Sequence, residues 1–295
     1  MLSEYLPAFT TAAHRKSPRT LYLDLFAGDH ENLSRTTREV IIGSPGVALD
    51  AEPPFAKTVL FELPAQAARL EAQLRTDFPN RDLEVVPGDC NETVPPTLLR
   101  LKREQWDWAP TFALVDQYAA EVRWSTLQQI ARFKRSETSK AELWLLFAHS
   151  MLPRGLASDD VEAVERFSQR ITAMYGTDRW RDPYRGRQLG IMGARELREQ
   201  LLNLMRWRIE KELGYRATHA FEMKNTQGGP LYSMVLATDH DAGERIMRHI
   251  YGGAAEAQPR MQAEAAAKLR GEGGEEGNLR SVRHRRAGRQ EEVSV

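Results

Sequence analysis

The stretch LYLDLFAG at residues 21–28 decides the fold. Its apolar residues favour strands, and the run stops at a small residue and a glycine before a polar segment. This pattern predicts a buried parallel strand that ends in a tight turn. Asp24 lies within the run, where an unpaired carboxylate is costly to bury. We therefore expect Asp24 to face a ligand or a ring of backbone donors. The alternative is an aspartate that only caps the following turn.

Length and composition limit the classes of protein. The chain has 295 residues, which suits either one large α/β domain with additions or two small domains. Its 41 basic and 41 acidic side chains balance, so no global field attracts nucleic acid or an anionic membrane. Any polyanionic partner must then bind to a local patch.

The cysteine content and the apolar runs indicate a cellular compartment. Cys90 is the single cysteine, which excludes an internal disulfide and a cysteine-based metal cluster and fits a reducing cytoplasm. No apolar run approaches the roughly 20 residues of a membrane span, and the N-terminus lacks a signal-peptide core. We expect a soluble cytoplasmic protein without a metal or a membrane partner.

Strand and helix patterns alternate with short loops through the first half of the chain. The predicted strands after the first cover residues 58–62, 82–86, 111–116 and 141–148, and helical periodicity covers 65–74 and 121–133. Serine before proline at residues 44 and 45 predicts a short helix to about residue 50. This alternation is typical of an α/β protein with a parallel sheet and helices on both faces.

The complete chain divides into five predicted regions. They are a lead-in helix in residues 1–19, a core in 20–150, a helical insertion in 151–213, a closing hairpin and helix in 214–252, and a flexible charged tail in 253–295. Within the insertion we expect helices over 159–174 and 194–213, and a loop over 176–187. Asn225 to Pro230 is a hairpin signal between two strands.

Carboxylates follow several strands, and they carry the functional argument. Asp24, Glu62, Asp89 and Asp116 belong to four strand ends or the residues just beyond them. In an open parallel sheet such ends converge on one crevice, at the point where the strand order reverses. Four acids favour a ligand rich in donors or positive charge. The phosphate-binding loop G-x-x-x-x-G-K-[ST] and the complete G-x-G-x-x-G fingerprint are both absent.

These strand ends resemble the class I methyltransferases that use S-adenosylmethionine, and more narrowly the three-Cys-motif partner family (TcmP). The matching segments, in the family's order, are residues 22–28, 43–45, 61–62, 87–91, 114–118 and 231–238. The resemblance implies a Rossmann-like seven-stranded methyltransferase sheet, mostly parallel, with a C-terminal antiparallel hairpin. It also implies S-adenosylmethionine as the cofactor.

The resemblance implies roles for individual residues. Asp24 would hold the methionine part of the cofactor, Glu62 would accept from the ribose hydroxyls, and Asp89 would meet the adenine amino group with Cys90 packed nearby. The implied cofactor site also includes the turn and the start of the next helix, which are Phe26, Ala27, Gly28 and Ser44.

Asp116 and Tyr118 are the implied catalytic residues. In nucleic-acid amino-methyltransferases an acid or Asn at this place accepts from the target amine, and an aromatic ring stacks on a flipped base. The family form resembles D-P-Y-G, whereas Gln117 and Ala119 stand here in place of the proline and glycine. Asp29-His30 replace a usual proline and second glycine, which adds bulk and charge beside the cofactor.

Substrate contacts are expected from four residues: Gln117, His149, Arg154 and Trp180. The loop 176–187 interleaves arginines with aromatic residues, so it could stack bases and neutralise phosphates. A salt-bridged surface loop is the alternative. The basic cluster 283–289 in the tail offers a weak nucleic-acid contact or none.

Two functions follow from these patterns. The first is a methyltransferase of TcmP type that acts on an amine of a nucleic acid or a related substrate. The second is a catalytically silent methyltransferase fold that binds a radical enzyme or nucleic acid as a partner, because the TcmP name implies a neighbouring radical enzyme. The sequence leaves the oligomeric state open.

Overall fold

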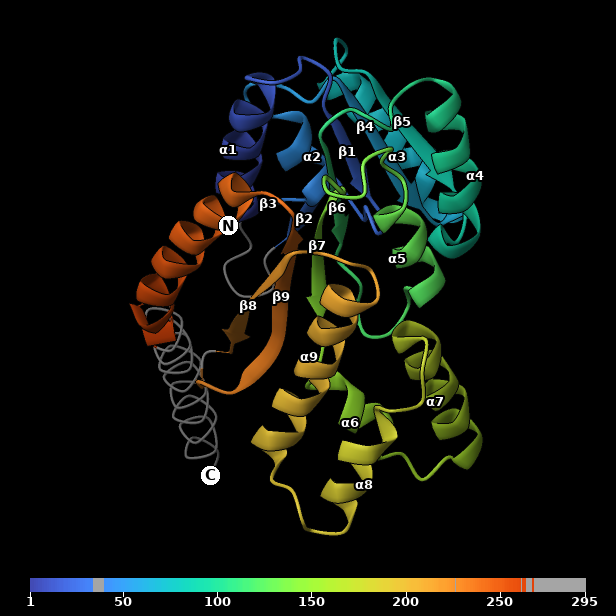
Figure 1. Ribbon diagram of the computed structural model, residues 1–295, viewed down its shortest axis with the longest axis vertical. Helices are drawn as coiled ribbons and strands as arrows, with labels where there is room; N and C mark the ends of the chain where they lie inside the picture. Colours follow the sequence, from blue (N-terminus) through green and yellow to red (C-terminus); the bar gives the residue numbers. More distant parts are fainter. Residues whose placement is uncertain (34–39, 226, 261, 264–266, 268–295) are drawn as a thin grey trace, which may run out of the picture.

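The computed structural model describes residues 1–33, 40–225, 227–260, 262–263 and 267. Its centre is a seven-stranded sheet in the order β5-β4-β1-β6-β7-β9-β8, and Figure 1 shows this sheet between two layers of helices. The strands are β1 (Leu21–Asp24), β4 (Lys57–Glu62), β5 (Leu83–Pro87), β6 (Thr111–Val115), β7 (Glu142–Phe147), β8 (Ala217–Lys224) and β9 (Pro230–Thr238).

The strand order confirms the predicted fold class. β1 pairs in parallel with β4 on one side and with β6 on the other, so the order reverses between β1 and β6. β9 pairs antiparallel with both β7 and β8 and closes the sheet with a hairpin. This is a Rossmann-like methyltransferase sheet, whose ligand crevice is expected at the carboxyl ends of the strands beside the reversal.

Helices cover both faces because each buried strand presents apolar side chains alternately to either side. One hydrophobic cluster packs the sheet against α4 (Cys90–Arg103), α5 (Trp124–Ala131), α7 (Val161–Tyr175) and α9 (Ala194–Lys211). The other packs it against α1 (Leu2–His14), α2 (Ser44–Leu49), α3 (Pro64–Asp77) and the helix at residues 241–260. In β1, Leu23 belongs to the first cluster and Tyr22 to the second.

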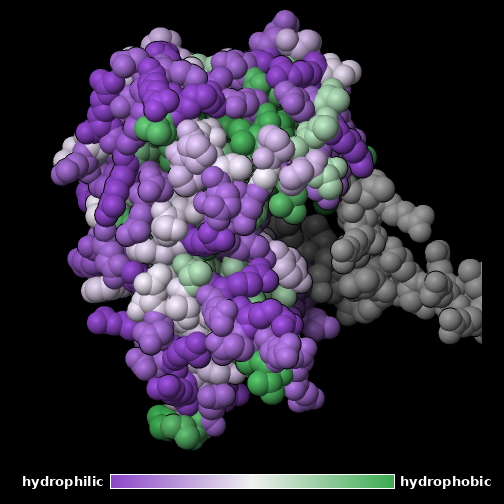
Figure 2. Space-filling model, turned by 90° about the vertical axis from the view of Figure 1, so that its right-hand side faces the viewer, coloured by the Kyte–Doolittle hydropathy of each residue, from purple (hydrophilic) through white to green (hydrophobic). Residues whose placement is uncertain are grey.

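The helical insertion follows β7 and contains α6 (Met151–Gly155), α7, α8 (Arg181–Gln188) and α9. The Asp160 side chain accepts from the Ala163 amide at 3.0 Å and starts α7, and Gly176 ends this helix with a left-handed φ of 64°. Figure 2 shows a mainly hydrophilic face with small hydrophobic patches, one of them at the lower end, where Figure 1 places α8.

The structure differs from the sequence predictions at several elements. A two-stranded hairpin of β2 (Glu31–Leu33) and β3 (Val40–Ile42) follows the first turn, in a segment that shows no strand periodicity. Helix α4 carries two prolines in its interior, Pro95 and Pro96, which hide its helical pattern in the sequence. The expected loop at 176–187 contains α8, whose polar sequence buries no residue.

The C-terminal part of the described chain is more helical than expected. The helix predicted over 240–251 runs through residues 241–260, and the basic cluster 283–289 lies outside the described residues. Within the described ranges, no helix combines the length and apolar character needed to cross a bilayer.

Candidate functional site

A cleft of about 560 Å³ opens at the carboxyl ends of β1, β4, β5 and β6. The strand-order reversal between β1 and β6 places it there. Three of the predicted acids, Glu62, Asp89 and Asp116, line it together with Tyr118 and Cys90. Chain segments that are distant in sequence thus share one site.

Glu62 orients the turn after β1. Its Oε2 accepts a hydrogen bond from the Gly28 amide at 2.6 Å, and its Oε1 accepts from the Leu63 amide at 2.7 Å. Gly28 has a φ of 66°, a left-handed value that favours glycine. Each carboxylate oxygen keeps a second lone pair, so Glu62 can accept further bonds from a ligand in the cleft.

Asp89 begins helix α4 at the edge of the cleft. Its Oδ1 accepts from the Asn91 amide at 2.8 Å and from the Asn91 side chain at 2.9 Å. Its Oδ2 makes no hydrogen bond to any described residue, so this oxygen is available to a ligand donor. Beside it, burial raises the pKa of the Cys90 thiol to about 12, which makes that cysteine a packing residue and not a nucleophile.

Asp116 and Tyr118 lie on the β6 side of the cleft. Asp116 is open to solvent, yet the surrounding protein desolvates it enough to raise the pKa of its carboxyl. The Tyr118 side chain is 76% exposed, which leaves its ring free to contact a substrate. The two side chains can therefore approach one ligand from the same loop.

Gln117, between them, points the other way. It is 1% exposed, and its Oε1 accepts from the amides of Glu121 and Val122, both at 2.9 Å. Its Nε2 donates to the Leu146 carbonyl at 3.4 Å. The expected substrate contact is therefore replaced by a structural role, because Gln117 holds the loop after β6 against β7.

Asp24 lies beneath the cleft and is fully buried. The Tyr22 hydroxyl donates to its Oδ2 at 3.1 Å and the Phe26 amide donates to its Oδ1 at 3.2 Å. Burial raises the pKa of Asp24 to about 7, with Asp116 adding to the rise and Ser44, Phe26 and Tyr22 opposing it. Asp24 thus accepts one backbone amide, that of Phe26 two residues on, and does not line the cleft, so it matches the alternative of a turn cap and not the expected ligand contact or ring of backbone donors.

Other predicted residues lie at or outside the edge of this cleft. Phe26 and Gly28 line it, whereas Ala27 is buried beside them and Ser44 donates to the Ala27 carbonyl at 3.5 Å. His30 turns away, because its Nε2 pairs with Asp77 at 3.2 Å on α3. The predicted bulk beside the cofactor is therefore directed elsewhere.

The remaining substrate candidates do not line the cleft. His149 is buried at the end of β7, with Nε2 3.0 Å from the Ser233 hydroxyl, and burial together with Arg198 lowers its pKa to about 4. Trp180 is 2% exposed and its indole donates to Thr172 at 2.9 Å, so it cannot stack on a base. Arg154 is exposed on α6.

The structure adds residues that the sequence did not indicate. Arg170 of α7 lines the cleft and pairs with Glu121 at 2.8 Å, so the insertion is tied to the loop after β6. Arg123 also lines it and pairs with Glu92 at 2.6 Å. The helical periodicity of α7 does not predict that Arg170 lines the cleft, because its partner Glu121 lies 49 positions earlier in sequence.

The carboxylates that line the cleft suit a cationic organic ligand and do not form a metal site. Within the described ranges, no group of three or more His, Cys, Asp or Glu side chains could hold a metal ion. Carboxylates spread along a cleft of this size suit a positively charged molecule with several hydrogen-bond donors.

Comparison with known proteins gives structural likeness only. No family model matches the chain, and no curated protein matches it. Among solved structures, a Legionella pneumophila protein of the DUF519 family has a TM-score of 0.49 and 11% identity over 88% of this chain and 93% of its own. TYW2 from M. jannaschii, solved in complex with AdoMet, has a TM-score of 0.34 and 10% identity over 79% of this chain and 74% of its own.

Proposed function

We propose that the chain binds S-adenosylmethionine in the cleft. The observation that carries this proposal is the position of Glu62, Asp89 and Asp116 around one 560 Å³ space at the strand-order reversal. The sulfonium and ammonium groups of the cofactor are cations, which carboxylates stabilise. Its ribose hydroxyls and adenine amine are donors that Glu62 and the unpaired Oδ2 of Asp89 can accept.

We further propose a methyl transfer to an amine of a nucleic acid or a related substrate, of the TcmP type. The nitrogen–methyl bond would form as the carbon–sulfur bond breaks with its electron pair left on sulfur, and the amine proton would pass to Asp116. The cofactor supplies the methyl group. The chain's own part is alignment: Asp116 accepts a hydrogen bond from the amine and Tyr118 packs on the base.

The second candidate is a silent binding protein that joins a complex with a radical enzyme or with nucleic acid. One observation favours it. Gln117 stands where the family form has a proline, and its side chain is committed to four contacts inside the protein and not to a substrate. The two candidates share the cofactor cleft and differ in whether the methyl group is transferred.

Calorimetric titration with S-adenosylmethionine tests the binding proposal. We expect saturable heat on the parent protein and about tenfold weaker binding in Asp89→Asn, which keeps the N-cap oxygen and removes the charge. Glu84→Gln is the matched control, because Glu84 pairs with Arg100 outside the cleft. Absence of heat on the parent would refute both candidates as cofactor-binding proteins.

Labelled methyl transfer separates the two candidates. The parent is incubated with radiolabelled S-adenosylmethionine and with pools of RNA, single-stranded DNA and protein. Label in nucleic acid that is lost in Asp116→Ala, which removes the acceptor, and reduced in Tyr118→Ala is the result we expect. Cofactor binding without label in any pool would favour the silent partner.

A further inference from the structure

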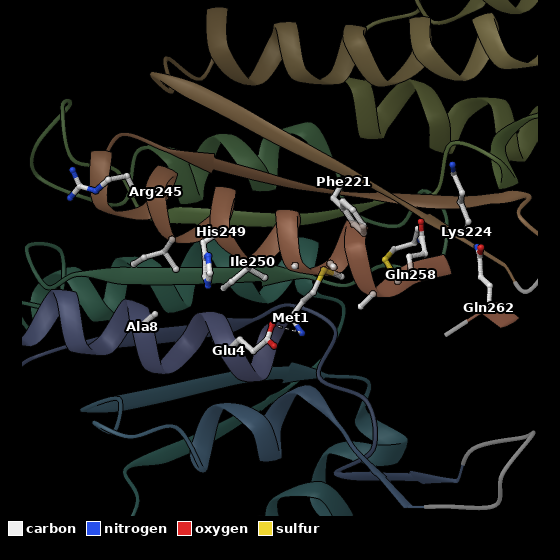
Figure 3. Close-up of a pocket in the computed structure, with 15 residues that line it drawn as sticks. Met1, Glu4, Ala8, Phe221, Lys224, Arg245, His249, Ile250, Gln258 and Gln262 are labelled. Atoms are coloured by element: carbon white, nitrogen blue, oxygen red, sulfur yellow. Dashed lines mark ion pairs between the residues drawn. The ribbon is translucent and has the colours of Figure 1, made fainter. Parts of the chain in front are cut away.

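A second pocket, of about 260 Å³, lies at the amino-terminal ends of β6 and β7, at the opposite end of the strands from the cofactor cleft. Its walls come from α1, from the segments before β6 and β7, and from the start of the helix at residues 241–260. Figure 3 shows α1 and this helix lying side by side, with Glu4 and Ala8 on one and Arg245 and His249 on the other. The pocket drawn in Figure 3 is a separate one; the 260 Å³ pocket lies further along the same two helices, where Ala12 of α1, Lys16 just beyond it and Ala242 of the other helix line it.

Positive charge gathers in this pocket without matching negative charge. Lys16, Lys134 and Lys140 all line it. Lys140 is neutralised by Asp239 at 3.2 Å. In the part of the chain that the structure describes, Lys16 has no hydrogen bond or ion pair through its ammonium group, and Lys134 donates only to the Ala109 carbonyl. Two ammonium groups therefore face the pocket without a carboxylate partner.

Lys16 and Lys134 line the same pocket as His240. Burial and the charge of Lys16 lower the pKa of His240, Asp239 opposes them, and Lys134 adds a smaller lowering effect. Burial lowers the pKa of Lys134 itself to about 8, and the charge of Asp107, which pairs with the neighbouring Arg135, opposes this only in part. An anion bound between the lysines would offset this desolvation.

The acid in the pocket is already committed. Glu142 is 3% exposed, accepts from the Tyr5 hydroxyl, and accepts from the Thr238 hydroxyl at 2.8 Å. It forms no ion pair with either lysine in the described chain. Its role is to join α1, β7 and β9, so it leaves the ammonium groups to a ligand.

Aromatic side chains form the apolar wall. Phe9 and Tyr5 are buried, whereas Trp108 is 48% exposed and offers a flat ring at the rim. The volume is less than half of that of the cofactor cleft, which suits a molecule with one ring and one charged group.

We propose that this pocket binds a small organic anion, whose phosphate or carboxylate lies between Lys16 and Lys134 and whose ring contacts Trp108 and Phe9. The ligand joins α1 to the C-terminal helix at the edge of the sheet remote from the cofactor cleft. This site is independent of the proposed methyl transfer.

The test is calorimetric titration of the full chain with phenyl phosphate in a low-salt, phosphate-free buffer. We expect one binding event that is about tenfold tighter than that of inorganic phosphate or of phenol, because only phenyl phosphate uses both parts of the pocket. Lys16→Met weakens it about tenfold, and Lys134→Met does the same if its circular dichroism shows a folded protein.

Lys102→Met is the matched control, because Lys102 also donates to a carbonyl, that of Arg132 at 3.0 Å, but lies outside the pocket. It should bind phenyl phosphate like the parent. Absence of binding to the parent overturns the proposal. Equal affinity in the parent and in Lys16→Met also overturns it, because Lys16 is exposed and its loss leaves the fold intact.

Discussion

The Glu62 carboxylate accepts the Gly28 amide at 2.6 Å and thereby joins the end of β4 to the turn that follows β1. The two residues are 34 positions apart in sequence, and both line the cleft at the carboxyl ends of the strands. The turn is thus held in its left-handed conformation by a side chain that also faces the ligand space. If the cleft binds S-adenosylmethionine as proposed, stability and cofactor binding are coupled at this one contact.

Glu62→Gln should therefore change both properties. The variant keeps one oxygen but turns an amide NH₂ toward one of two backbone donors, so we expect a loss of about 1–3 kcal/mol in the free energy of unfolding. The affinity for S-adenosylmethionine should fall about tenfold. Urea unfolding and calorimetry measure the two effects. An unchanged free energy of unfolding would contradict the coupling.

Asp24→Asn should change the pH dependence of stability. Because burial raises the pKa of Asp24 from 3.8 to about 7, the folded protein binds more protons than the unfolded chain between these values. The free energy of unfolding contributed by Asp24 is thus largest at low pH and falls as pH rises to about 7, by at most roughly 4 kcal/mol. Urea unfolding of the parent and the variant at several pH values should show this slope only in the parent.

His149→Gln tests the opposite sign. Burial lowers the pKa of His149 from 6.5 to about 4, so the unfolded chain binds more protons between these values. Its contribution is complete above pH 6.5 and falls as pH decreases, by roughly 3 kcal/mol. In the same pH series, the free energy of unfolding should fall in acid for the parent, and this fall should be absent from the variant. If the free energy of unfolding had the same pH dependence in the parent and in the variant, the assigned role of His149 would be refuted.

Gln117→Ala should destabilise the protein and leave the cofactor bound. The substitution strips two buried amides, those of Glu121 and Val122, of their acceptor, so we expect a loss of about 2 kcal/mol or more. Methyl transfer should fall while the affinity for S-adenosylmethionine stays within about twofold. Gln129→Ala is the control, because Gln129 is exposed on α5.

Tyr118→Ala should leave stability unchanged within about 0.5 kcal/mol, because the side chain is 76% exposed. Label transfer to nucleic acid should fall by about tenfold or more, since base–aromatic stacking is worth about 1–3 kcal/mol. Tyr118→Phe keeps the ring and should retain most of the transfer. If Tyr118→Phe were as inactive as Tyr118→Ala, the hydroxyl and not the ring would carry the role.

Periodicity and turn residues predict most of the sheet. Each strand expected between residues 21 and 148 is present, and these strands pair in parallel. The sequence pattern does not predict helix α4, because Pro95 and Pro96 interrupt its periodicity, although Asp89 before it is a good N-cap. The hairpin of β2 and β3 is not predicted either, because its strands are too short to show a periodicity.

The direction in which a side chain points is the feature that the sequence predicts least well. Asp24 and Asp116 both end strands, yet Asp24 faces Tyr22 and Phe26 whereas Asp116 faces the cleft. Trp180 reads as a surface aromatic among arginines, but Thr172 on the preceding helix holds its indole inside. These directions depend on contacts between distant segments, which spacing along the chain does not encode.

The central position of β1 sets the time at which the cleft can form during synthesis. β1 is made early, but its partner β6 ends at Val115, and the α7 residues that border the cleft follow much later. A ribosome-bound chain that stops before β6 has a half-built sheet edge exposed beside Asp24, open to wrong pairing. Nascent chains of this protein therefore complete the cleft only after the helical insertion has left the exit tunnel.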